Sequence, residues 1–338
     1  MSTSPFEERY SGQSWSGWER DKNVDPRILA TTDVFREALA TQAENNTDVL
    51  VIACGEAAHQ VTCRFAERCA DRFLSLESGS REAGHRAVEA ARKGSTVFVC
   101  VGDSMSVAAL WPVLRDDICR GRLDVKLVAA AAGFSAHEDS PPPDILEDLA
   151  LLRVLPRMTV VIPADADETK RVLRWSLETR GPAYIRLSSL PTRGVTKRLT
   201  HFEPGQADVI NPGWDVALIA SGPLVGVALD TAEELELDCV SARVLNFSTI
   251  KPMDRTAVVE AAIATRRIVT LEEHQIVGGL GSAVAEIIAQ EGCGGRVRMM
   301  GLNNEFLADL PAKDLSRHYG LTVGRLVEVT KELIASVP

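Results

Sequence analysis

The chain has 338 residues and a formal net charge of -10 at pH 7, with 45% hydrophobic and 25% charged residues. This composition is typical of a globular protein, and the length allows two domains with separate cores. The acidic excess argues against nucleic-acid binding, because no basic stripe is present to meet phosphates.

The cysteines indicate a reducing compartment, and the apolar segments indicate no membrane span. The 7 cysteines are an odd number and include no C-x-x-C pair, so we expect free thiols and no zinc site. No apolar run approaches the roughly 20 residues of a membrane span, and the N-terminus has no basic-then-apolar signal. We therefore expect a cytoplasmic protein.

Residues 1–24 are rich in serine, tryptophan and charge and show no periodicity, so we interpret them as an irregular arm. This arm contains several aromatic side chains, which supply apolar contact area, so we expect it to lie on another surface. They are Phe6, Tyr10, Trp15 and Trp18. Disorder is the alternative interpretation.

Residues 25–190 alternate between strand and helix patterns, which indicates an α/β domain with a mainly parallel sheet. Thr32 is the expected cap of the first helix. The predicted strands are 48–53, 97–101, 125–130, 160–163 and 183–187, and the predicted helices are 32–42, 107–119, 144–152 and 166–178.

A second α/β series is predicted over residues 213–338, after a linker at 191–212 that is rich in Pro, Thr, Arg and Gly and lacks core periodicity. The predicted strands are 216–220, 239–246, 267–271 and 297–301, and the predicted helices are 223–234, 254–265, 282–290 and 322–337.

The run from Leu271 to Glu286 (LEEHQIVGGLGSAVAE) joins a buried strand, a charged turn, a glycine cluster and a small-residue helix. The glycines allow close approach of backbone or ligand. Glu273 and His274 at the end of the strand are candidates to bind a ligand or a partner chain. The alternative is a capped turn whose charges are only solvated.

This run and three others resemble the transketolases and related enzymes that use thiamine diphosphate. The other three are residues 147–165 (EDLALLRVLPRMTVVIPAD), 181–187 (GPAYIRL) and 249–254 (TIKPMD), in the order and spacing found in that family. The resemblance extends from about Ile28 to the end. It implies two doubly wound domains, a thiamine diphosphate pyrimidine-binding fold followed by a transketolase C-terminal-domain fold.

The resemblance also implies a partner chain. The family holds the cofactor's diphosphate through a metal ion on a G-D-G motif with a later paired asparagine, whereas Gly102-Asp103-Ser104 has no such asparagine downstream. We expect the C-terminal subunit of a split enzyme, with thiamine diphosphate shared with a separate diphosphate-binding chain that holds Mg²⁺. A heterotetramer of two copies of each chain is the simplest assembly.

In the family, a glutamate in a Gly-x-x-Glu turn hydrogen-bonds the aminopyrimidine ring of the cofactor. Counting back from Gly94 without gaps places Ser80 at this position, whereas a compensated gap places Glu82 there and restores Gly79-Ser80-Arg81-Glu82. Glu82 is the preferred candidate. The alternative for Glu82 is a solvated acid in the first turn of a helix, where the helix dipole favours negative charge.

Other site positions follow from the same resemblance. Glu56, Gly102 and Met105 are assigned to the cofactor, with Met105 in place of a stacking aromatic residue. His137, Glu138 and Asp139 are candidate substrate contacts. The alternative is that the acids cap a helix or are solvated, and that His137 points to solvent.

Two histidines and an arginine that contact sugar phosphates in the family are replaced by Ala131, Pro143 and Ser189. A phosphate requires such donors and fixed charge. The resemblance therefore implies transfer of a two-carbon ketol unit to an acceptor other than a common sugar phosphate, in specialised metabolism. The alternatives are a catalytically silent subunit that stabilises or regulates its partner, and the β subunit of a 2-oxoacid dehydrogenase.

Overall fold

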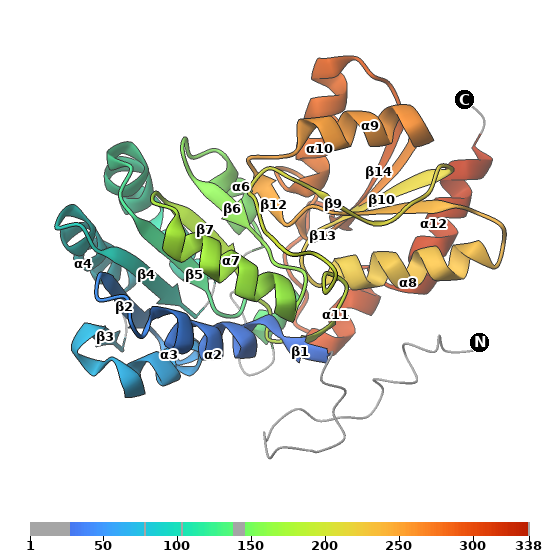
Figure 1. The fold of residues 1–338 in the computed structure, drawn as a ribbon. Helices are drawn as coiled ribbons and strands as arrows, with labels where there is room; N and C mark the ends of the chain where they lie inside the picture. The colour runs from blue at the N-terminus through green and yellow to red at the C-terminus, as the bar shows by residue number, and fades with distance from the viewer. Residues whose placement is uncertain (1–27, 78, 103, 138–145, 337–338) are drawn as a thin grey trace.

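The computed structural model describes residues 28–77, 79–102, 104–137 and 146–336. Two α/β lobes lie side by side, each with its own sheet (Figure 1). This arrangement confirms the α/β fold class with mainly parallel sheets. Among the described residues, no helix is long and apolar enough to cross a membrane.

The first lobe is built on a seven-stranded sheet in the order β12-β6-β7-β5-β4-β2-β3. All neighbouring strands are parallel except β12, which pairs antiparallel with β6. The buried apolar runs of β2, β4 and β5 are those expected of a sheet covered on both faces. The strands are β2 (Val49–Cys54), β3 (Phe73–Leu76), β4 (Thr96–Val101), β5 (Val125–Ala129), β6 (Thr159–Val161), β7 (Ala183–Arg186) and β12 (Thr249–Lys251).

Helices cover both faces of this sheet (Figure 1). α2 (Thr31–Ala43), α3 (Glu56–Arg68) and α7 (Ala166–Glu178) supply one apolar layer, which includes Phe35, Phe65 and Leu173. The opposite layer comes from α4 (Ser80–Arg92), α5 (Ser104–Val113), the π-helical turn η2 (Leu114–Cys119) and α6 (Asp148–Arg153). Short 3-10 turns lie at Ala70–Arg72 (η1) and Gly133–His137 (η3).

The second lobe contains a five-stranded sheet in the order β14-β13-β10-β11-β9, parallel except for β9. α9 and α10 pack on one face, and α8 and α12 pack on the other. The strands are β9 (Asp208–Asn211), β10 (Val216–Ala220), β11 (Ala242–Asn246), β13 (Arg267–Gln275) and β14 (Arg296–Leu302). The helices are α8 (Leu224–Glu236), α9 (Arg255–Thr265), α10 (Leu280–Glu291), α11 (Ala312–His318) and α12 (Val323–Ala335).

Helix caps explain several boundaries that the sequence predicts. Asp165 accepts a hydrogen bond from the backbone N of Glu168 at the start of α7, and Asp254 accepts one from Ala257 at the start of α9. The prediction for Thr32 is wrong, because α2 begins one residue earlier and has no side-chain cap. The Thr31 hydroxyl instead donates to the carbonyl of Ser188 at 3.0 Å.

Two strands lie within the segment 191–212. β8 (Pro191–Arg193) pairs antiparallel with β1 (Ile28–Ala30), and β9 joins the sheet of the second lobe. β12 also crosses between the lobes, since it follows β11 in the chain but pairs with β6 in the seven-stranded sheet. Backbone pairing therefore fixes the two lobes to each other at this strand.

The predicted charged turn after residue 271 is wrong. β13 continues to Gln275, and Glu272, Glu273 and His274 are buried strand residues. These three side chains can be buried because backbone N–H groups of the first lobe and of the start of α10 form hydrogen bonds with them.

Candidate functional site

The carboxyl ends of the parallel strands β2, β4 and β5 meet at one edge of the seven-stranded sheet. α3 begins directly after β2, and α5 begins shortly after β4. α4 begins near the end of the neighbouring strand β3. Several helix N-termini therefore face the same edge, which is the usual location of ligand sites in open α/β sheets.

Glu56, Gly102 and Met105 all lie at this edge. Glu56 is the first residue of α3, is exposed, and follows Gly55, whose φ is 87°. Gly102 follows β4 and packs against α3, since an added Cβ would lie 3.5 Å from the Cβ of Ala57. Met105 is in the first turn of α5 with 42% of its surface exposed.

Ser80 and Glu82 occupy the first turn of α4, after Gly79 with φ of 103°. Glu82 has a 55% exposed side chain and a hydrogen bond of 3.4 Å from Arg86 on the next turn. Ser80 is partly buried and lies one helical turn before Ala83 and Gly84, the first buried residues of α4. Both alternatives for the ring-binding position thus face the same edge, on different sides of the helix.

The three candidate substrate contacts lie only partly within the described residues. His137 ends the turn η3, whereas Glu138 and Asp139 lie outside the described residues. Within the ranges that the structure describes, no three His, Cys, Asp or Glu side chains gather closely enough to hold a metal ion.

This edge fits the ring of thiamine diphosphate in two respects. Met105 presents an apolar surface, and Glu56 and Glu82 present carboxylates that can accept hydrogen bonds from an aminopyrimidine. Among the described residues, no side chain caps the start of α3 at Gly55 or of α4 at Gly79. The exposure of both acids means that a dry pocket needs another surface to cover this edge.

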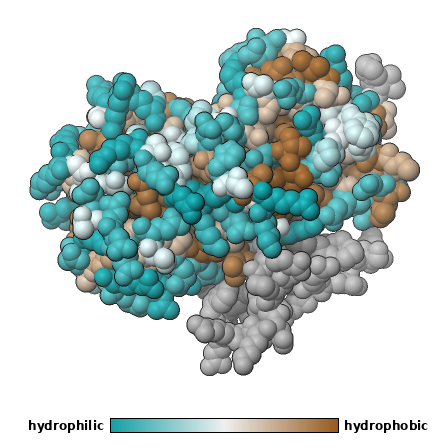
Figure 2. Space-filling view, in the orientation of Figure 1, coloured by the Kyte–Doolittle hydropathy of each residue, from teal (hydrophilic) through white to brown (hydrophobic). Residues whose placement is uncertain are grey.

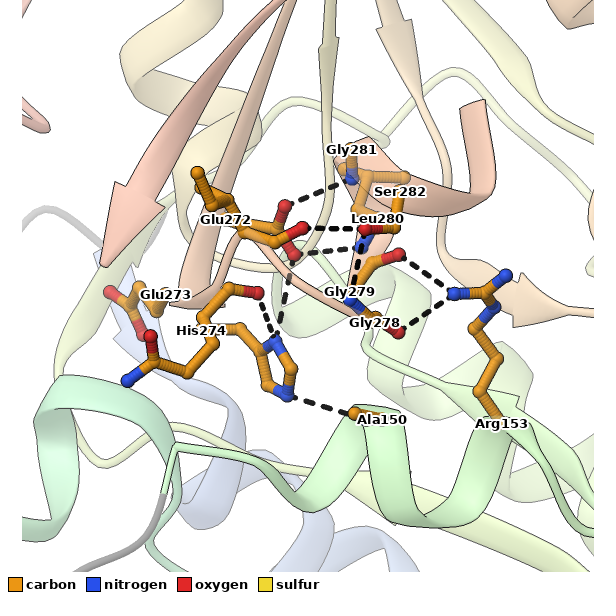
Figure 3. Close-up of polar contacts among 12 residues, drawn as sticks. Ala150, Arg153, Glu272, Glu273, His274, Gly278, Gly279, Leu280, Gly281 and Ser282 are labelled. Atoms are coloured by element: carbon orange, nitrogen blue, oxygen red, sulfur yellow. Dashed lines mark hydrogen bonds and ion pairs between the residues drawn. The ribbon is translucent and has the colours of Figure 1, made fainter. Parts of the chain in front are cut away.

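Glu272 forms a second polar centre, between the lobes, where it caps α10 (Figure 3). Its carboxyl oxygens accept hydrogen bonds from the backbone N of Leu280 at 2.7 Å and of Gly281 at 2.9 Å. Gly279 and Gly281 allow this approach, because an added Cβ on Gly279 would lie 1.8 Å from Oε2 of Glu272. Burial raises the pKa of Glu272 to about 7, against the opposing effect of these two N–H donors.

Glu273 and His274 hold the second lobe against the first. Oε2 of Glu273 accepts from the backbone N of Phe134 at 3.3 Å. Nε2 of His274 is 3.3 Å from the donating backbone N of Ala150, and Nδ1 is 2.6 Å from the carbonyl oxygen of Gln275 (Figure 3). These partners assign the proton of a neutral imidazole to Nδ1. Burial lowers the pKa of His274 to about 4, which agrees with a neutral ring.

A buried ion pair extends this contact. The Arg186 guanidinium donates to both carboxyl oxygens of Asp148, at 2.9 and 3.2 Å, and to the carbonyl oxygen of Glu273 at 2.9 Å. The Tyr184 hydroxyl donates to Asp148 at 2.6 Å. Arg153 donates to the carbonyl of Gly278 at 2.8 Å and pairs with Glu286. We define the interlobe cluster as Asp148, Arg153, Tyr184, Arg186, Glu272, Glu273 and His274.

The interlobe cluster is therefore structural in this chain. Glu273 and His274 are neither solvated nor open to a ligand, since they are 7% and 0% exposed. The sequence did not indicate that Asp148, Tyr184 and Arg186 form a hydrogen-bonded group beside Glu273. All three lie in the motifs that carry the family resemblance, but nothing local in the sequence shows that these distant segments meet.

Comparison with known proteins places both lobes in one family. Residues 28–193 match the family described as the transketolase pyrimidine-binding domain, and residues 205–326 match the transketolase C-terminal domain. A solved structure described as a split gene transketolase, in an inactive β4 tetramer, is similar with a TM-score of 0.83 and 32% identity. The match covers 90% of this chain and 98% of that one.

Individual relatives show the same pattern. The chain is 30% identical to a transketolase C-terminal section of Methanocaldococcus jannaschii, over 85% of this chain and 90% of the relative. It is 27% identical to one subunit of the apulose-4-phosphate transketolase of Phocaeicola vulgatus, over 91% of this chain and 98% of the relative. The chain spans about half the length of the curated 1-deoxy-D-xylulose-5-phosphate synthases that it also matches.

Proposed function

This chain belongs to the transketolase family, and from that premise we propose that it is the C-terminal subunit of a two-chain transketolase-like enzyme. The family is thiamine diphosphate-dependent, and its members are transferases. In the proposal, a separate subunit carries the diphosphate-binding domain and holds Mg²⁺. Two copies of each chain form a heterotetramer.

The main support for this proposal is that the chain aligns along its length with relatives that are separate subunits. This chain matches nearly the whole length of the apulose-4-phosphate transketolase subunit and of the split gene transketolase chain. The exposure of Glu56, Glu82 and Met105 supports the same conclusion. A carboxylate that binds the cofactor ring works best in a dry site, and a partner chain laid over this edge would exclude water from it.

When bound, thiamine diphosphate supplies the carbon nucleophile of ketol transfer. The proposed roles of this chain are to bind and orient. Glu82, or Ser80 in the alternative alignment, hydrogen-bonds the pyrimidine ring, and Met105 packs against it. Glu56 and Gly102 complete the cofactor side of the pocket. His137, Glu138 and Asp139 are assigned to the substrate side.

The proposed acceptor is not a common sugar phosphate, and two described positions support this. Ala131 has no polar side chain, and the hydroxyl of Ser189 donates to the carbonyl of Ser135 at 3.1 Å. Neither position supplies a fixed positive charge for a phosphate group. We propose a role in specialised metabolism, which such a change of acceptor would suit.

The test is reconstitution of the full chain with its diphosphate-binding partner. Binding of thiamine diphosphate is measured by calorimetry, and turnover is measured with several ketose and 2-oxoacid donors and with phosphorylated and unphosphorylated acceptors. Replacement of the ring-binding carboxyl should lower kcat by about 100-fold or more. Glu82→Ala is compared with Ser80→Ala, and Glu89→Ala is the matched control, an exposed acid later in the same helix.

The outcomes distinguish the proposals. Loss of turnover in Glu82→Ala alone supports Glu82, and loss in Ser80→Ala alone supports the ungapped alignment. If this chain binds the cofactor tightly and turns over without a partner, the two-chain proposal is wrong. If the pair binds the cofactor but transfers no ketol unit, the silent subunit is favoured, and oxidative decarboxylation of a 2-oxoacid would favour the dehydrogenase β subunit.

A further inference from the structure

A basic pocket lies at the edge of the seven-stranded sheet opposite to the proposed cofactor site. It has a volume of about 410 Å³ and is formed where β5, β6 and β7 begin and α7 ends. These strands are parallel neighbours, so their amino ends share one edge. Its charged and aromatic lining residues are Arg122, Lys126, Arg157, Trp175 and Arg180.

The floor of this basic pocket is electrically balanced. The Lys126 ammonium is 2.7 Å from Oδ1 of Asp124, and both side chains are at least 95% buried. The same ammonium donates to the carbonyl oxygens of Thr179 and Gly181, each at 2.7 Å. Lys126 therefore neutralises Asp124 and satisfies the carbonyls at the end of α7, which would otherwise repel an anion.

The three arginines of the pocket, Arg122, Arg157 and Arg180, have more N–H donors than the acceptors that they contact within the described residues. Within the described residues, neither Arg122 nor Arg157 forms an ion pair with a carboxylate, and Arg180 is 3.9 Å from Asp124. Arg157 donates through Nη1 to the carbonyl oxygens of Cys119 and Arg120, and Arg180 donates through Nη1 to that of Gly94. A guanidinium has five N–H donors, so Arg157 and Arg180 keep donors that these contacts do not use.

Three partly unsatisfied guanidinium groups surround one pocket on a chain with a net charge of -10. Most of the molecular surface in the view of Figure 2 is hydrophilic. A pocket differs from such an open surface because its lining brings several charged groups close together. Positive charge concentrated in this way attracts anions, and guanidinium groups bind phosphate oxygens in a fork. The pocket also has an apolar wall, formed by the partly buried Trp175 and by Pro182. Its volume falls in the range of small-molecule sites, and it exceeds what a single phosphate would fill.

We propose that this basic pocket binds a small molecule of nucleotide size that carries at least two phosphate groups. The arginines Arg122, Arg157 and Arg180 hold the phosphates, and the organic part packs against Trp175 and Pro182. The site is separate from the proposed cofactor edge, so a ligand here would be an effector and not a substrate. Binding at this pocket would require neither the acceptor nor the partner chain.

The test uses the full 338-residue chain and calorimetric titration with ADP, pyrophosphate and adenosine, at low and high salt. ADP should bind, and its affinity should fall as salt rises. Pyrophosphate should bind about tenfold more weakly than ADP, and adenosine should not bind measurably, because the charged contacts supply most of the affinity.

Variants locate the site. Arg122→Ser should weaken ADP binding about tenfold or more, and Arg122→Ser combined with Arg157→Ser should abolish it. Arg325→Ser is the matched control, an exposed arginine on α12 in the other lobe, and should bind as the unmodified chain does. Circular dichroism melting of each variant excludes loss of folding as the cause.

Absence of ADP binding in the unmodified chain would overturn the proposal. Equal affinity in the unmodified chain and in the double variant would also overturn it, since ADP would then bind elsewhere. Equal affinity of pyrophosphate and ADP would overturn the assignment of an organic part to Trp175 and Pro182. None of these outcomes depends on turnover, so they are independent of the test of the proposed function.

Discussion

The ion pair between Arg186 and Asp148 gives the sharpest test of how the two lobes are held together. The two side chains are 5% and 0% exposed, and the guanidinium also donates to the carbonyl of Glu273 in the second lobe. Arg186→Met keeps much of the apolar stem but removes all three hydrogen bonds. It leaves the buried carboxylate of Asp148 with Tyr184 as a donor.

Arg186→Met should lower the free energy of unfolding strongly, because the buried Asp148 carboxylate loses its counter-charge. Such changes destabilise proteins by about 3–5 kcal/mol, whereas exposed pairs contribute about 0–1 kcal/mol. The urea m-value grows with chain length and should be about 3–4 kcal/mol per M for a chain of this size, so the unfolding midpoint of Arg186→Met should fall by about 1 M. Arg325→Met is the matched control, since Arg325 pairs with Glu328 on an exposed helix face.

Urea unfolding followed by circular dichroism measures this difference, and a double-mutant cycle isolates the pair. Asp148→Asn should also destabilise the chain, because it leaves Arg186 buried without its counter-charge. The double variant should be more stable than the sum of the two single changes by about 1 kcal/mol or more. If Arg186→Met costs no more than Arg325→Met, or if the single changes simply add, the interlobe cluster does not stabilise the fold as we infer.

Three further predictions concern buried polar groups. Gly279→Ala should lower the free energy of unfolding by about 2 kcal/mol or more, because the added Cβ displaces Glu272. Gly324→Ala is the control, since its Cβ would meet no atom within 4 Å, and thermal melting should show it to be neutral or slightly stabilising. Burial raises the pKa of Glu168 from 4.5 to about 7, so its proton is held more tightly in the folded state, and the free energy of unfolding should fall by about 3 kcal/mol as pH rises from 4.5 through 7. Glu168→Gln should reduce that slope in urea titrations from pH 5 to 8, and the part that remains belongs to Glu272, whose pKa burial also raises to about 7. The imidazole of His274 should stay neutral above about pH 5 in an NMR titration, because burial lowers its pKa from 6.5 to about 4, and its contribution to stability should be lost as pH falls through that interval.

Glu168 is a suitable reporter because its neighbours accommodate both protonation states. Its carboxyl oxygens accept from the backbone N of Ala164 at 2.6 Å and from the amide of Asn246 at 2.9 Å. The amide oxygen of Asn246 is buried and has no hydrogen-bond partner among the residues that the structure describes. With its amide rotated, Asn246 would accept a hydrogen bond through Oδ1 from neutral Glu168 or from the amide N–H of Glu168→Gln. A slope that is undiminished in the Gln variant would assign it to groups other than Glu168.

Much of the fold follows from local patterns in the sequence. The boundaries predicted for residues 166–178 and 216–220 agree with those of α7 and β10, because a strong cap or a continuous apolar run marks each one. The motifs at 147–165, 181–187 and 249–254 led to the family, which the comparisons confirm. The short strands β1, β3, β8, β9 and β12 were not predicted, since three or four residues carry little periodicity and pair with distant partners.

The sequence alone determined the α/β architecture and the family, because hydrophobic periodicity and motif spacing are written along the chain. It also named the residues that the structure places at one sheet edge, Glu56, Ser80, Glu82, Gly102 and Met105. Only the tertiary structure decided that Glu273 and His274 are buried between the lobes. Charged residues are buried only when partners are supplied, and here the partners Phe134 and Ala150 come from more than 120 residues away in the sequence.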